Sequence, residues 1–243
     1  MNAQTVKVMT YNLHSAVGMD KLRDTGRISA LIKAQNPDLC GLQEVLRKYR
    51  PEPVDMPREL EDGTEMKIYF GAALSRNTDG VHLDYGIASL SKQDSELAEI
   101  IMLPWEHGCE PRAAVVLKIH HPAGDFYFIN THLSYEHDLD DERLEQLQKI
   151  LDVMREKNYL PAVITGDFNA EPDSPCIRLL EENCTVVNHG TRTFSTYDPL
   201  IQIDYIAFTP RNAFSVLDMQ VIPEKTASDH FPVCATLIPH FGR

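Results

Sequence analysis

Polar side chains interrupt strongly apolar stretches at several widely separated places in this sequence. Each lies at the end of an apolar run or just inside one: Asn12, Glu44, His132, Asp167, Asn169, Asp204 and His230. A buried strand is destabilised by a carboxylate or an imidazole unless another polar group pairs with it. A shared active site at one rim of a sheet would explain all of these positions together.

Glu44 closes the apolar run that begins at Leu39, and it is the candidate for the principal metal ligand. A hard divalent cation such as Mg²⁺ binds carboxylate oxygen and needs few protein ligands, because it keeps several of its waters. The alternative is an acid that only caps the end of a strand. Asn12 also follows an apolar run, and its amide could orient a carboxylate or contact a phosphate. An asparagine at this position is otherwise a common turn residue.

The segment Gly166-Asp167-Phe168-Asn169 follows a run with the composition of a buried strand. Asp167 and Asn169 are two residues apart, so both side chains would project to one side if the chain stays extended. An acid beside an amide suits activation of water, or protonation of a leaving group, next to a phosphate contact. The competing interpretation is an Asx-turn at the end of the strand.

Asp204 lies inside an apolar run, where a carboxylate requires a partner, and His230 is the natural one. A carboxylate bonded to one ring nitrogen fixes the tautomer of an imidazole and stabilises its protonated form. Burial would lower the pKa of His230, whereas the neighbouring carboxylate would raise it. The adjacent Asp229 would face the other way in an extended strand, which favours a metal ligand or a member of a water network.

His132 and Arg112 are further candidates for contact with a phosphate. His132 is an imidazole at a strand end, suited to a phosphate oxygen or a leaving group. Arg112 opens a predicted strand and could clamp a phosphate, because its guanidinium donates bidentately and stays charged. A surface ion pair is the alternative for Arg112. The sequence has no HExxH or His-x-His cluster, which argues against a zinc hydrolase.

Many short strands must position these side chains. Apolar runs bounded by Gly, Pro, Asn or Asp predict strands at residues 6–11, 39–43, 68–73, 86–91, 113–119, 126–131, 162–165, 203–208, 215–221 and 233–238. Helical patterns predict helices at residues 25–35, 140–157 and 175–181. We therefore expect an α/β (α+β) protein, with two sheets packed face to face and helices outside. The proline-spaced segment 49–63 is interpreted as a surface loop beside Glu44 and a candidate substrate loop.

Composition narrows the class of protein. At 243 residues and 43% hydrophobic content, the chain can form a sizeable core, and we expect one domain over residues 1–243. No apolar run approaches the roughly 18 residues needed to cross a bilayer. The N-terminus does not resemble a signal peptide, and five cysteines without CxxC spacing predict reduced thiols in the cytoplasm. The net charge of −13 argues against a broad nucleic-acid surface.

Taken in order, these segments resemble the endonuclease/exonuclease/phosphatase superfamily of deoxyribonuclease I-like, metal-dependent phosphoesterases. The matching segments are residues 10–12, 42–45, 85–91, 130–133, 166–169, 203–206 and 228–230. No single segment is specific, but all of them in this order are. The resemblance implies a four-layer α/β sandwich of two mixed sheets flanked by helices. It also implies that Glu44 binds Mg²⁺ or Mn²⁺, with Asn12 and Asp229 nearby.

The resemblance implies roles for the remaining candidates as well. Asp167 would handle the nucleophilic water or the leaving group, and Asn169 would hold the phosphate. His230, oriented by Asp204, would act as acid or base or stabilise the pentacovalent oxygens, with His132 alongside. His14 stands where the repair nucleases of the family place an acid. This departure argues against abasic-site repair.

The expected activity is that of a Mg²⁺-dependent phosphoesterase, a phosphodiesterase that hydrolyses its substrate by in-line attack of water. The substrate would be a small molecule, a lipid headgroup or a nucleic acid, with nuclease action as the alternative to the first two. We expect a monomer without stable membrane insertion. A non-catalytic binding module is the alternative from another class, but such a module would lose a central residue, and none is missing.

Overall fold

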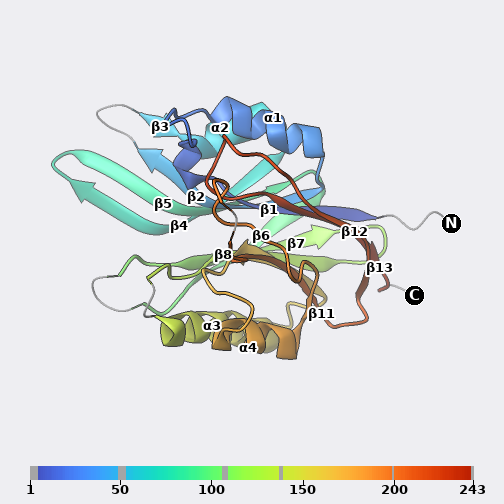
Figure 1. Cartoon of the computed structure of the whole chain (residues 1–243). Coiled ribbons are helices and arrows are strands. Elements are labelled where there is room, and N and C mark those ends of the chain that lie inside the picture. Colours follow the sequence, from blue (N-terminus) through green and yellow to red (C-terminus); the bar gives the residue numbers. More distant parts are fainter. Residues whose placement is uncertain (1–4, 49–52, 106–108, 137–138, 199, 242–243) are drawn as a thin grey trace.

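Two β-sheets lie face to face, with a pair of helices over the outer face of each (Figure 1). The computed structural model describes residues 5–48, 53–105, 109–136, 139–198 and 200–241. In spatial order, the first sheet contains β12 (Phe214–Val221), β13 (Val233–Pro239), β1 (Val6–Asn12), β2 (Leu39–Lys48), β5 (Val81–Ser91) and β4 (Lys67–Thr78), with β3 (Val54–Asp55) paired to β2. The second contains β10 (Thr185–Val186), β11 (Asp204–Thr209), β9 (Ala162–Asp167), β8 (Phe126–His132), β7 (Ala113–His120) and β6 (Asp94–Met102).

Three apolar cores join the layers. Val8, Val115 and Phe128 belong to the core between the two sheets. The helices α1 (Thr25–Gln35) and α2 (Met56–Thr64) cover the first sheet, and α3 (Asp140–Lys157) and α4 (Pro175–Asn183) cover the second. This arrangement confirms the expected four-layer α/β sandwich. None of the described helices is long and apolar enough to span a membrane.

Both sheets are mixed, and each contains one parallel pair of central strands. Strands β1 and β2 pair in parallel, as do β8 and β9, while the other pairs are antiparallel. Asn12, His132 and Asp167 are the last residues of β1, β8 and β9. In the register of the second sheet, Asp167 lies between His132 on one side and Asp204 on the other. Strand pairing alone therefore brings three of the polar residues to one rim.

A β-bulge aims Glu44 at the same rim. Leu42 pairs with Ala88 and Val45 with Gly86, so the two residues Gln43 and Glu44 oppose a single residue of β5. Glu44 has a φ of +58°, a left-handed conformation that is uncommon for a residue with a side chain. Bulges re-aim side chains next to active sites, and left-handed residues outside helix caps and turns cluster at such sites.

The interpretation of residues 49–63 as a surface loop is wrong over residues 54–63. That segment contains β3 and most of α2, and Met56 and Leu60 are fully buried. Asp55 caps the helix by accepting a hydrogen bond from the Arg58 amide at 3.3 Å, and Pro57 is compatible with a first helical turn because its missing N–H has no partner there anyway. Residues 49–52 lie outside the described residues. The edge strand β6 was not predicted either, since most of its side chains are exposed and charged residues interrupt its apolar ones.

Candidate active site

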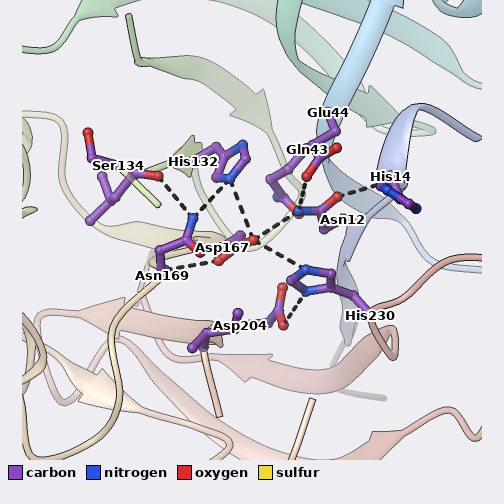
Figure 2. A network of polar contacts seen from close by, with 12 residues as sticks. Asn12, His14, Gln43, Glu44, His132, Ser134, Asp167, Asn169, Asp204 and His230 are labelled. Atoms are coloured by element: carbon purple, nitrogen blue, oxygen red, sulfur yellow. Dashed lines mark hydrogen bonds and ion pairs between the residues drawn. The ribbon is translucent and has the colours of Figure 1, made fainter. Parts of the chain in front are cut away.

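Asn12 joins the two sheets at the centre of the site (Figure 2). Its side-chain nitrogen Nδ2 donates to Glu44 Oε1 at 3.0 Å and to Asp167 Oδ2 at 2.9 Å. Its side-chain oxygen Oδ1 accepts from the His14 backbone amide at 3.0 Å, which orients the side chain. One amide thus holds a carboxylate of the first sheet and a carboxylate of the second at a fixed separation.

Asp167 is the most densely contacted of these residues. Its Oδ1 accepts from the Asn169 backbone amide at 2.9 Å, and its Oδ2 lies 3.5 Å from His132 Nε2 and 3.7 Å from His230 Nε2. Asn169 has a φ of +48°, so the chain turns here and does not stay extended. The predicted Asx-turn and the predicted cluster of functional groups are therefore both present. Burial raises the pKa of the Asp167 carboxyl, and the negative charge of Asp204 raises it further.

His230 pairs with Asp204 as expected. His230 Nδ1 lies 2.9 Å from Asp204 Oδ2, and both side chains are almost fully buried. Desolvation by burial lowers the pKa of His230, but the negative charges of Asp204 and Asp167 outweigh it and raise the pKa to about 10. His230 is therefore an imidazolium at neutral pH, with Nε2 facing Asp167.

His132, in contrast, is a neutral imidazole. Burial lowers its pKa well below the ordinary value, and the positive charges of Arg112 and His230 lower it further. Its Nδ1 lies 3.0 Å from Arg112 Nη1, and its Nε2 lies 3.1 Å from Asn169 Nδ2. A neutral and a cationic imidazole thus flank the same carboxylate. Two titratable groups whose pKa values are pushed apart are typical of acid–base sites.

These groups open onto a cleft of about 790 Å³. Its lining includes Glu44, Arg112, His132, Asp167, Asn169, Asp229 and His230. Asn12 and Asp204 are each only 1% exposed and hold the lining residues from behind. The predicted site residues are therefore brought together, because three successive contacts lead from the Glu44 carboxylate through Asn12 and Asp167 to the His230 imidazole.

A model of the endonuclease/exonuclease/phosphatase family matches residues 9–230. The chain belongs to this family. The resemblance seen in the sequence is thereby confirmed, and the described fold agrees with it. A solved family protein from Beutenbergia cavernae has a TM-score of 0.81 and 26% identity, covering 97% of this chain and 72% of that one.

Two other proteins are similar to the present chain. A mannosyl-6-phosphatase of Bacteroides thetaiotaomicron has a TM-score of 0.75 and 20% identity over 96% of this chain and 99% of that one, which is a likeness of fold. Protein angel of Drosophila melanogaster is 24% identical over 192 residues, 70% of this chain and 54% of that protein. The chain therefore spans about half the length of that curated relative.

Enzymes of this family generally depend on a divalent metal, and the donor chemistry at Glu44 fits one. Glu44 lines the cleft, and its Oε1 is held by Asn12, which suits a hard cation that needs few protein ligands. Asp229 also lines the cleft, with Oδ1 3.8 Å from His14 Nδ1. A second group of donor atoms comes from Asp167, Asp204 and His230, and these atoms lie within 4.8 Å of one another. That group fits a metal poorly, since His230 already supplies a positive charge and its Nδ1 is bonded to Asp204.

Several lining residues of this family member were not predicted as site residues. Tyr85 belongs to a segment that carried the family resemblance, so its position there was the available signal. Glu110 and Tyr135 sit two or three residues from predicted site residues, which was too weak a signal without the structure. Phe194 packs against His230 with ring centroids 4.7 Å apart and ring planes tilted by 47°, and nothing in the sequence distinguished it.

Proposed function

We propose that this protein is a metal-dependent phosphoric ester hydrolase, and specifically a phosphodiesterase that uses water as its nucleophile. The observation that carries the proposal is one buried carboxylate, Asp167, flanked by a neutral His132 and a cationic His230. Such a site can accept a proton on one side and stabilise negative charge on the other. Both are required when water attacks a phosphorus atom.

Glu44 would hold Mg²⁺ or Mn²⁺ together with Asp229, and the ion would supply positive charge beside the phosphate oxygens. Asn12 keeps the Glu44 carboxylate at a fixed distance from Asp167, so the ion and the base would act on the same phosphate. Asp167 has a raised pKa because it is buried, which makes it a better proton acceptor than an exposed carboxylate.

His230 would stabilise the charge that develops during the reaction. As an imidazolium, it can donate through Nε2 to an oxygen of the phosphate or to the departing alkoxide. Asp204 keeps the proton on Nδ1 and the ring in position, without itself taking part in proton transfer. Asn169 and His132 would bind another phosphate oxygen.

The charges of the cleft favour a small phosphodiester over a nucleic acid. The two arginines among the described lining residues are both neutralised, Arg112 by Glu110 at 2.9 Å and Arg143 by Asp140 at 2.7 Å. Glu171 adds a further carboxylate to the lining. A substrate with many phosphates would therefore meet repulsion beyond the first one, in addition to that from the net charge of −13.

A substrate panel tests the proposal. Purified protein is incubated with bis-p-nitrophenyl phosphate, p-nitrophenyl phosphate, mannose 6-phosphate, sphingomyelin, phosphoinositides, plasmid DNA and RNA, with Mg²⁺, with Mn²⁺ or with EDTA. Metal-dependent release from the diesters, lost with EDTA, is the expected result. Mannose 6-phosphate is included because one structural neighbour is a mannosyl-6-phosphatase. Absence of turnover on every ester with both metals would favour a non-catalytic binding module.

A further inference from the structure

Arg112 lies underneath His132 and does not simply extend into the cleft. Its side chain is only 4% exposed, and its Nη1 lies 2.9 Å from Glu110 Oε1 and 3.0 Å from His132 Nδ1. Its guanidinium carbon also lies over the ring of Tyr135, 5.6 Å from the ring centroid. Arg112 was predicted as a phosphate clamp, but Nη1, one of the nitrogens that would bind the phosphate, is already engaged by Glu110 and His132.

The contact with His132 fixes where the imidazole carries its proton. A guanidinium has donors only and stays protonated in proteins. His132 Nδ1 must therefore be an acceptor, so a neutral ring has its one N–H on Nε2. Burial and the positive charge of Arg112 keep the ring neutral, because both lower its pKa.

Nε2 then faces a second donor. Asn169 Nδ2 lies 3.1 Å from His132 Nε2 and also donates to the Leu133 carbonyl oxygen at 3.1 Å. Asp167 Oδ2 lies 3.5 Å from His132 Nε2, which is beyond good hydrogen-bonding distance for Nε2–H. Two N–H donors lie next to each other at the cleft, and an anionic oxygen between them would satisfy both.

We propose that Arg112 is a positioning residue that holds His132 as the Nε2–H tautomer, so that His132 and Asn169 form a pair of donors for one phosphoryl oxygen. This role rests on the proposed function, because it assigns the oxygen to the phosphate of the substrate. This role differs from that of a phosphate clamp. Removing Arg112 would change which nitrogen of His132 carries the proton, and phosphate binding would weaken because of that change.

Nitrogen-15 NMR of histidine in the metal-free protein tests the tautomer directly. The signals of His132 are assigned with His132→Gln, and the two ring nitrogens are distinguished by their chemical shifts. We expect the Nε2–H form in the wild type, and a mixture with Nδ1–H, together with a higher pKa of His132, in Arg112→Met. Arg112→Lys retains a cationic donor and should restore the Nε2–H form. If the single variant fails to fold, the double variant Arg112→Met, Glu110→Gln avoids leaving the half-buried Glu110 carboxylate without its partner.

Binding of inorganic phosphate, measured by calorimetry with Mg²⁺ on the same variants, tests the consequence. A hydrogen bond to a charged group is worth a factor of about 10 to 100 in affinity, so Arg112→Met should weaken phosphate binding by that factor and Arg112→Lys should recover most of it. An Nδ1–H tautomer in the wild type would overturn the inference, as would weakened phosphate binding in Arg112→Met with an unchanged tautomer. The tautomer is read without turnover, so a protein with the expected tautomer that cleaves no phosphoester would contradict the proposed function instead.

Discussion

Replacing Asp204 by asparagine should strongly lower the pKa of His230. The Asp204 carboxylate is 1% exposed and lies 2.9 Å from His230 Nδ1, and its charge is the largest influence that raises the pKa of the imidazole against burial. The amide of asparagine keeps the shape but removes the charge. One pKa unit corresponds to about 1.4 kcal/mol, and a hydrogen bond to a charged group contributes about 1.5–3 kcal/mol. Loss of that bond and of the charge should lower the pKa of His230 by at least about two units.

The consequence for catalysis follows from the charge state. Asp204→Asn should bring the pKa of His230 from about 10 to about 8 or below, so the imidazolium that stabilises the developing charge is largely lost at pH 9, and the carboxylate that orients the ring is lost at every pH. We expect kcat on bis-p-nitrophenyl phosphate to fall by about 10²- to 10⁴-fold. Removing one partner of a buried charged pair should also lower the free energy of unfolding by about 3–5 kcal/mol.

The assay is a pH titration of the His230 ring by NMR, combined with kcat and urea denaturation on the same preparations. Asp218→Asn is the matched control, because it makes the same chemical change at an exposed position on β12. The reasoning is refuted if Asp204→Asn is folded and its His230 titrates as in the wild type. It is refuted equally if the pKa falls as expected while kcat stays at the wild-type value.

Further predictions concern the metal, the interface between the sheets and the pH dependence of stability. Glu44→Gln should lower Mg²⁺ affinity at least about tenfold in calorimetry, whereas the exposed control Glu182→Gln should not; equal affinities for the two variants would contradict the assignment. In Gly41→Ala the added Cβ would lie 2.4 Å from Thr165 Oγ1, so the free energy of unfolding in urea should fall by about 1–3 kcal/mol, and an unchanged midpoint would argue against such close packing. The pKa of His230 is about 10 in the folded protein and near 6.5 in the unfolded chain, so between these pH values only the folded protein retains the proton. Metal-free protein should therefore lose stability as the pH rises through this window, by at most about 1.4 kcal/mol per pH unit. His230→Gln should flatten this decline, and an equally steep decline in that variant would exclude His230 as its source.

The polar residues at the ends of apolar runs were predictable because strand burial is readable from composition. Parallel strands end at the same edge of a sheet, and the register that places His132 beside Asp167 follows from that rule. The pairing of Asp204 with His230 was also accessible, since a carboxylate within an apolar run needs a partner.

What the sequence did not reveal depends on backbone geometry and on contacts across layers. The bulge that turns Glu44 requires an extra residue relative to β5, and no local pattern in β2 marks it. The expectation that Asp167 and Asn169 share a side of an extended strand had the wrong geometry, because the chain turns at Asn169. Helix α2 was hidden by the proline spacing of the segment, because Pro57 lies in the first turn of the helix, where proline is tolerated. The position of Arg112 beneath His132 arises from the pairing of β7 with β8 and could not be read from either segment alone.

The most direct test of the proposed reaction is to follow the label when a phosphodiester is hydrolysed in water enriched in oxygen-18, with Mg²⁺ and with EDTA. The cleft is proposed to direct water onto phosphorus, so the heavy oxygen should appear in the phosphate product of the wild type and not in the released alcohol. Asp167→Asn should slow this incorporation without changing where the label goes. Label in the alcohol, or cleavage that persists undiminished in EDTA, would contradict a metal-dependent attack of water on phosphorus.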